Sequence, residues 1–257
     1  MRRWIALLRM DLIRAMISVR FVWTVLFIFV VMEISSYGYI DPRAHVDVFY
    51  LLGGAIGASG SSIFLFCIAP ILPFGTAFAT DVEDKAYPFW IVRTGIAGYS
   101  SSKFVAAALS GFLSIAAGIG LFTLIMSFFF PFFIQINSGN PYVVLLEHNQ
   151  PGAYLVLIMI HFGLSGTLFA GGAMAVSAYI PNKFSVVAIP VVVFWVLMRV
   201  TSIPGIPEIL QIGIIVQAFT GTTPWAAMLN KLVPTLLILI ALFGLFLTKT
   251  RRRMLNT

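Results

Sequence analysis

The chain has 257 residues, 60% of them hydrophobic and only 10% charged, and its mean hydropathy is +1.01. Soluble domains carry about 25% charged residues, so this composition excludes both a soluble globular domain and a disordered chain. The net charge of +7 would suggest nucleic acid as a partner in a soluble protein. Here the Lys and Arg residues lie at the ends of long apolar blocks, where they set membrane orientation. We therefore expect no nucleic-acid partner and an all-α, polytopic membrane protein.

Residues 1–20 have the pattern of an amphipathic helix lying on the membrane surface. Apolar residues gather on one side of a helical wheel and five arginines on the other, which suits the boundary between headgroups and acyl chains. The apolar face is expected to contain Trp4, Ile5, Leu8, Leu12, Ala15, Met16 and Val19, and the basic face Arg2, Arg3, Arg9, Arg14 and Arg20.

Six membrane-spanning helices are expected to follow. The second contains several glycines together with Pro70 and Pro73, so we expect it to be kinked. Within residues 201–230, the apolar stretch 210–219 is too short to cross ~30 Å of hydrocarbon and is expected to be extracellular or re-entrant. The expected spans lie at 21–39, within 51–79, and at 104–133, 154–180, 184–200 and 232–248.

The distribution of basic residues predicts the orientation. Segments on the side of the two termini carry 13 Lys and Arg residues, against 3 on the other side. The positive-inside rule then places both termini in the cytoplasm. The cytoplasmic segments are short and contain no GxxxxGK[ST] phosphate loop, so no nucleotide site is expected on this chain.

The segment 80–103, between the second and third spans, carries the most informative side chains. It opens with acidic residues, continues with aromatic residues and ends with basic ones. An aromatic cluster ringed by charge suggests a protein contact, while an aromatic belt at headgroup level is the alternative. The candidate residues are Asp81, Glu83, Asp84, Lys85, Phe89, Trp90, Arg93, Tyr99 and Lys103.

The layout resembles that of ABC-2 type permeases, the membrane subunits of bacterial ABC exporters. It combines an N-terminal amphipathic helix, six spans and a loop with an acidic start, a later Arg and a Tyr-x-x-x-Lys entry to the third span. The loop residues that carry the resemblance are Asp81, Glu83, Asp84, Arg93, Tyr99 and Lys103. The resemblance implies one permease domain over 1–257, with 1–20 as the connecting helix, 80–103 as the coupling loop and a re-entrant segment between spans five and six.

The same resemblance implies the partners and the cargo. Two cytoplasmic ABC ATPase subunits would bind ATP and Mg²⁺, so the chain itself would hold no cofactor or metal and have no catalytic residue. A second permease copy, identical or related, would complete the transporter in the bacterial cytoplasmic membrane, in contact with lipid. The small size implies export of amphipathic peptides, including antimicrobial ones, or of hydrophobic toxic compounds.

Two ionisable residues within spans are candidates for a gate. Glu33 lies in the outer part of the first span and Arg199 near the outer end of the fifth. Charges in a membrane are costly and usually paired or functional, so we expect an ion pair that closes the extracellular gate, within one subunit or across a dimer. Separate snorkelling of each side chain to the interface is the alternative.

An enzyme and a non-transporting subunit are the competing hypotheses. Gly57-Ala58-Ser59-Gly60 matches the GxSG nucleophile motif of rhomboid intramembrane proteases, and His161 would supply the base. Rhomboids place these residues in the fourth and sixth spans, whereas here they fall in the second and fourth. An immunity or receptor subunit without transport activity is the third hypothesis.

Overall fold

The computed structural model describes residues 2–40, 46–57, 63–134 and 140–255. These residues form helices joined by turns and irregular segments, and no strand occurs among them. Five of these helices are long and apolar enough to cross a membrane. The prediction of an all-helical fold is confirmed, and the five helices agree with a protein that spans a membrane several times. They are α2 (Val19–Ser36, continued by a turn at Tyr37–Tyr39), α5 (Tyr87–Met126), α7 (Pro151–Tyr179), α8 (Lys183–Thr201) and α10 (Pro224–Leu255).

Helices α5 and α7 form the centre of the bundle and share its largest helix–helix contact. Their backbones meet at Gly111 and Gly166. A Cβ on Gly111 would lie 2.6 Å from the carbonyl oxygen of Gly166, so neither position has room for a side chain. Small residues allow this close approach between membrane helices. Helices α2 and α10 then pack against the central pair.

The second expected span runs along the bundle in short pieces, not as one helix. The pieces are α3 (Val48–Gly57), a wide helical turn at Ile63–Ile68, a tight turn at Ala69–Ile71 and α4 (Ala77–Glu83). The Val48 N–H donates to the carbonyl of Pro131 at one end of α5, while α4 packs near the other end. Proline lacks an amide donor, and Pro70 and Pro73 lie where the helix is interrupted.

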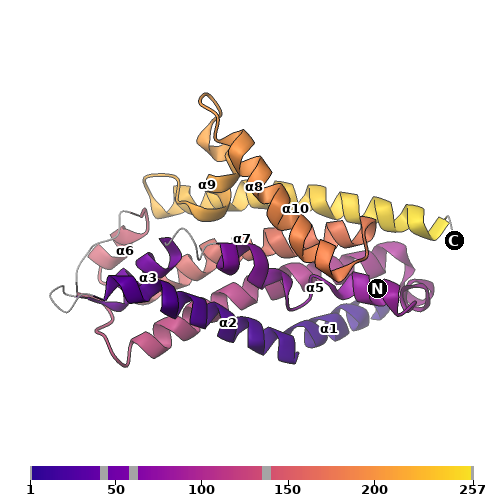
Figure 1. Ribbon diagram of the computed structural model, residues 1–257, viewed down its shortest axis with the longest axis horizontal. Helices are drawn as coiled ribbons and strands as arrows, with labels where there is room; N and C mark the ends of the chain where they lie inside the picture. The colour runs from indigo at the N-terminus through magenta and orange to yellow at the C-terminus, as the bar shows by residue number, and fades with distance from the viewer. Residues whose placement is uncertain (1, 41–45, 58–62, 135–139, 256–257) are drawn as a thin grey trace.

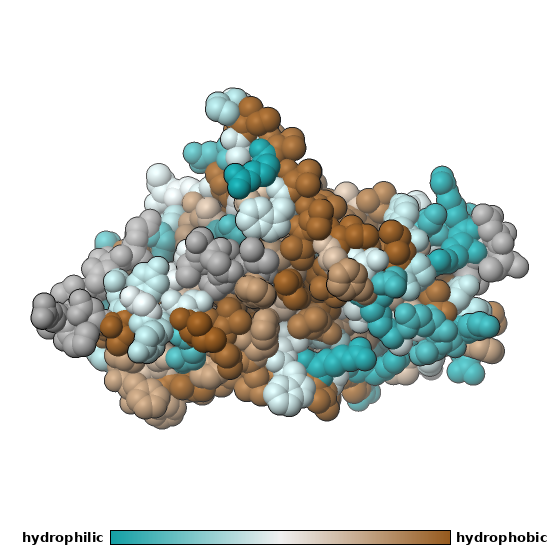
Figure 2. Space-filling model, viewed as in Figure 1, coloured by the Kyte–Doolittle hydropathy of each residue, from teal (hydrophilic) through white to brown (hydrophobic). Residues whose placement is uncertain are grey.

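Both termini lie at the same end of the bundle, which we call the near end (Figure 1). On the face shown in Figure 2, hydrophilic residues gather at this end, over α1 (Arg2–Met16) and the last turns of α10, while hydrophobic residues cover the middle of the molecule and α8. Helix α8 leans away from the bundle (Figure 1). A charged end next to a broad apolar band is the surface expected of a membrane protein.

Several helix boundaries differ from the expected ones. The third expected span corresponds to α5, which starts at Tyr87 and ends at Met126. The helix ends before residue 133 because turns follow Met126 and lead to Pro131. The last helix begins at Pro224, eight residues before residue 232. The N-terminal helix ends at Met16, where Ser18 caps α2 by accepting a hydrogen bond from the Phe21 N–H.

The segment 80–103 is mostly helical. Helix α4 ends at Glu83 and α5 begins at Tyr87. Gly95 interrupts α5 with φ 76° and ψ 162°, a conformation essentially restricted to glycine. Residues 87–94 therefore form a separate short helix, called the short helix below, in front of the long membrane helix.

The expected re-entrant segment contains only short helices among its described residues. A turn at Glu208–Leu210 precedes α9 (Ile212–Gln217), and both lie between α8 and α10. Six residues cannot cross a bilayer, so α9 is not a further span.

Candidate functional site

Helix α1 turns one stripe of side chains toward α5. Leu7, Asp11 and Ala15 are buried, and the Trp4 indole N–H donates to Ser101 Oγ at 2.8 Å. This spacing of three and four residues marks one face of a helix. The apolar face expected from the wheel is thus divided, because Trp4 and Ala15 face the protein while Ile5 is exposed. A carboxylate, that of Asp11, lies at the centre of the packed face.

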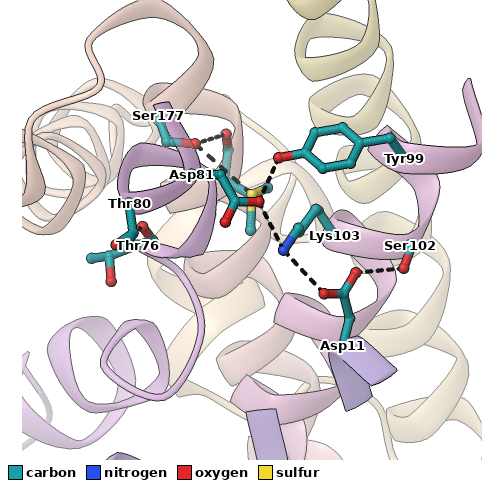
Figure 3. A network of polar contacts seen from close by, with 9 residues as sticks. Asp11, Thr76, Thr80, Asp81, Tyr99, Ser102, Lys103 and Ser177 are labelled. Carbon is teal, nitrogen blue, oxygen red and sulfur yellow. Dashed lines mark hydrogen bonds and ion pairs between the residues drawn. The ribbon is translucent and has the colours of Figure 1, made fainter. Parts of the chain in front are cut away.

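A buried ionic network joins three helices at the near end (Figure 3). Lys103 Nζ of α5 lies 3.0 Å from Asp11 Oδ1 of α1 and 3.0 Å from Asp81 Oδ2 of α4. The Tyr99 hydroxyl donates to Asp81 Oδ2 at 2.7 Å, and the Ser102 hydroxyl donates to Asp11 Oδ2 at 2.6 Å. We call these five residues the near-end network.

The near-end network holds two carboxylates for one ammonium group, all nearly inaccessible to solvent. The side chains of Lys103, Asp11 and Asp81 are 1%, 0% and 6% exposed. Desolvating charges is costly, so such a cluster persists only when every group has partners. The hydroxyls of Tyr99 and Ser102 supply the additional donors. Because each charge comes from a different helix, the network fixes the positions of α1, α4 and α5 relative to one another.

The short helix presents an apolar surface next to this network. Phe89 and Val92, three residues apart on one face, are 72% and 86% exposed, whereas Ile91 is buried. Trp90 and Arg93 face α1, where they line a pocket with Arg3. Exposed apolar residues at a charged end of a protein indicate a contact surface.

The other candidates of segment 80–103 are more dispersed. Glu83 forms an exposed ion pair with Lys183 at the start of α8, with Oε2 and Nζ 2.6 Å apart. Asp84 and Lys85 are exposed in the turn after α4, and Lys85 has a positive φ of 52°. The structure therefore brings Asp81, Tyr99 and Lys103 together, and leaves Asp84, Lys85 and Phe89 on the surface.

A second buried lysine lies toward the opposite, far end of the bundle. Lys231 of α10 is 2% exposed, and its Nζ donates to Ser165 Oγ of α7 at 2.7 Å. It also donates to the carbonyls of Ile215 and Val216 at the end of α9, the latter at 3.1 Å. Within the described part of the chain, no carboxylate lies within 4.0 Å of this lysine. A cation at the C-terminal end of a helix is favourably placed, so Lys231 holds α9 against α7.

His161 is fully hydrogen-bonded beside this lysine. Its Nε2 lies 3.2 Å from the carbonyl oxygen of Ala218, and its Nδ1 lies 3.0 Å from the hydroxyl of Tyr142. Burial raises the pKa of Tyr142 to about 12, so its hydroxyl is protonated and can donate to Nδ1. A carbonyl can only accept, which gives a neutral ring with the proton on Nε2. Both ring nitrogens therefore form hydrogen bonds, which does not favour His161 as a catalytic base. Most of the GxSG motif of the protease hypothesis, Ala58, Ser59 and Gly60, lies outside the described residues.

The expected gate residues do not pair within the chain. Glu33 lies on α2 and Arg199 in the last turn of α8, and the ion pairs of the described residues include neither. Arg199 is exposed. A pair across a dimer remains a prediction.

Sequence reasoning missed two residues that organise these sites. Asp11 is the only acidic residue in the basic segment 1–20, and a single carboxylate there could have indicated a buried ion pair. Lys231 was counted only as one of the loop charges that predict the orientation, although it lies within α10. Comparisons of the chain with protein-family models, curated proteins and solved structures found no match.

Proposed function

We propose that the chain is the membrane subunit of an ATP-driven exporter and that a separate ATPase subunit docks on the short helix. The observation that supports this proposal is the exposed pair Phe89 and Val92 on the short helix. The near-end network, which joins α1, α4 and α5, follows in the next turns of the same helix. Apolar side chains in a contact surface contribute most when a partner desolvates them. ATP and Mg²⁺ bind to the partner, which supplies the energy.

The near-end network supports a role in transmitting movement. The short helix is separated from the rest of α5 only by Gly95, and Tyr99 and Lys103 follow within two turns. A displacement of the short helix therefore reaches the network before it reaches the membrane helices. Since packed elements change position as units, α1, α4 and the start of α5 move together.

In this arrangement the near end is cytoplasmic and the broken segment from α3 to α4 crosses as a sixth span. The basic residues at both termini support this orientation. Two copies of the permease and two ATPases assemble into one transporter of the bacterial cytoplasmic membrane.

An apolar groove supports a hydrophobic or amphipathic cargo such as a peptide. It has a volume of about 390 Å³ and lies between α7, α8, α9 and α10. Its walls include Phe169, Gly172, Pro190, Phe194 and Leu242. Ligand sites are mostly apolar and lie between helices of a bundle. Tyr179 is the one polar side chain among the lining residues and none of them is charged, so these walls do not suit a charged, water-soluble cargo.

The test places a photo-crosslinking amino acid at Phe89, with Phe128 as the matched control. Both are exposed phenylalanines on or beside α5, 72% and 78% exposed, at opposite ends of the helix. The chain is expressed in its native host, and the crosslinked partners are identified by mass spectrometry. We expect crosslinks to the ATPase from residue 89 and none from residue 128.

Substitution sharpens the same test. We expect Phe89→Asp to reduce ATPase co-purification by about tenfold or more, as for a residue at the centre of an interface, and Phe128→Asp to leave it unchanged. An ATPase that co-purifies equally with both variants and crosslinks from neither position would contradict the proposal. Cleavage of a membrane substrate that depends on Ser59 would favour the protease instead.

A further inference from the structure

A pocket of about 480 Å³ lies between α1 and the short helix, outside the near-end network. Ala6, Leu7 and Met10 of α1 form its apolar wall. The short helix contributes Trp90, Arg93 and Thr94, and Arg3 of α1 completes the lining. The Thr94 hydroxyl donates to the Trp90 carbonyl at 2.9 Å. The two guanidinium groups and the Trp90 indole N–H are then the side-chain donors of the lining that remain available.

These two arginines place positive charge in the pocket without a compensating acid. Among the described residues, no carboxylate lies within 4.0 Å of Arg3 or Arg93. Both side chains are exposed, so an anion can reach them from the solvent or from the lipid headgroups. Two like charges that line one pocket raise its affinity for an anion. Arginine binds phosphate oxygens through two parallel N–H groups, so phosphate chemistry fits the pair.

The depth of the pocket indicates the source of the phosphate. Helix α1 carries a second, apolar groove lined by Ile5, Leu8, Leu12, Ile13 and neighbouring residues. Several of these side chains are exposed in the structure, with Ile5 at 54% and Ile13 at 47%. A helix with such a face lies in the interface with its basic residues at the headgroups. Arg3 is then at headgroup level, and tryptophan is enriched at that level.

We propose that this pocket binds the phosphate-bearing headgroup of an anionic phospholipid of the same leaflet, with Arg3 and Arg93 contacting the phosphate. Trp90 and Met10 receive the glycerol backbone and the first acyl carbons. The bound lipid bridges α1 and the short helix. This binding is a property of the permease chain alone, so it does not depend on the ATPase proposed above.

The experiment measures lipid binding to the purified full-length chain by native mass spectrometry in detergent. The probe is dioctanoyl phosphatidylglycerol, with dioctanoyl phosphatidylcholine and inorganic phosphate as comparisons. We expect Arg3→Gln and Arg93→Gln each to weaken phosphatidylglycerol binding by about tenfold, the usual effect of losing a charge-assisted hydrogen bond. Arg252→Gln is the control, since it removes the same charge from an exposed position on α10.

Other results overturn the proposal. Equal losses in Arg3→Gln, Arg93→Gln and Arg252→Gln would show unspecific attraction between charges. Phosphatidylcholine bound as tightly as phosphatidylglycerol would remove the requirement for an anionic lipid. Inorganic phosphate that displaces the lipid at equal concentration would indicate a soluble anion. The number of bound lipids separates a shared site from two sites. At a shared site each single variant weakens the same bound lipid, whereas with two sites each single variant loses one lipid and leaves the other bound with unchanged affinity.

Discussion

Two buried lysines stabilise the two ends of this bundle in different ways. Lys103 at the near end contacts two carboxylates, from α1 and α4. Lys231 at the far end contacts a hydroxyl and two carbonyls, from α7 and α9. Both side chains are at most 2% exposed, so burial does not distinguish them. Their partners distinguish them, since Lys103 neutralises two carboxylates and Lys231 satisfies carbonyls at the end of the short helix α9.

The difference indicates which end can rearrange. An ion cluster buried between three helices loses much free energy when one charge leaves. A lysine at the end of a helix interacts with partial charges, and each contact contributes less. We therefore expect the near end to move as one unit and α9, held at the far end, to detach at lower cost. Substitutions at four positions, with matched controls, test this comparison.

Lys103→Met is expected to have the largest effect. It leaves Asp11 and Asp81 as two buried carboxylates without a cation, which costs about 3–5 kcal/mol. The measurement is the free energy of unfolding in mixed detergent micelles. Adding Asp11→Asn and Asp81→Asn removes both charges and should restore most of the loss. A triple variant as unstable as the single one would show that packing of the lysine stem, not charge, stabilises the near end.

Lys231→Met is expected to cost less, about 1–3 kcal/mol, because its acceptors are neutral and the Val216 carbonyl keeps its hydrogen bond from the Ser165 hydroxyl. The effect should be local. Hydrogen exchange is expected to rise in α9, where the partners Ile215 and Val216 lie, and to stay unchanged in α1. A loss as large as that of Lys103→Met would contradict the distinction between the two lysines.

Tyr99→Phe tests a single hydroxyl of the near-end network. It removes one donor to Asp81 while the contact of Asp81 with Lys103 remains, so we expect a loss of about 1–2 kcal/mol. Ser102→Ala removes the corresponding donor to Asp11 and serves as the matched variant. The same unfolding measurement applies. Two losses below the error of that measurement would show that the network does not need its hydroxyls.

Lys183→Gln is expected to have the smallest effect. Its ion pair with Glu83 is 51% and 43% exposed at the two side chains, and exposed pairs contribute about 0–1 kcal/mol. Raising the salt concentration should reduce even this difference, because salt screens exposed charges. A stability change comparable to that of Tyr99→Phe would mean that a partner buries this pair in the assembled protein.

The sequence predicted those features that depend on composition and local pattern. The boundaries of α2, α7 and α8 lie within three residues of the expected ones, because long apolar runs and capping residues such as Asn182 are local signals. Asp81, Tyr99 and Lys103 of segment 80–103 were expected to act in coupling to an ATPase, which stays a prediction; their burial in one network was not expected.

The remaining features depend on which helices pack together. The partnership of Asp11 with Lys103, residues 92 positions apart, follows from the contact of α1 with α5 and not from a helical wheel. The expected pairing of Glu33 with Arg199 rested on matched depth and opposite charge, and neither property decides which helices are neighbours. The role of Lys231 requires knowing that α9 folds back against α7.

Gly95 gives the near end a joint whose angle a substitution can change without disturbing the packing of neighbouring residues. A Cβ built at this position meets no atom of a neighbouring residue within 4 Å. The strain of an alanine here would therefore come from its own backbone, because φ 76° and ψ 162° suit only glycine. Replacing Gly95 therefore separates two properties of the proposed coupling: the binding of a partner to the short helix, and the transmission of its movement to the membrane helix. The variant keeps the surface offered to a partner, while it changes the angle at which that surface is joined to the membrane helix.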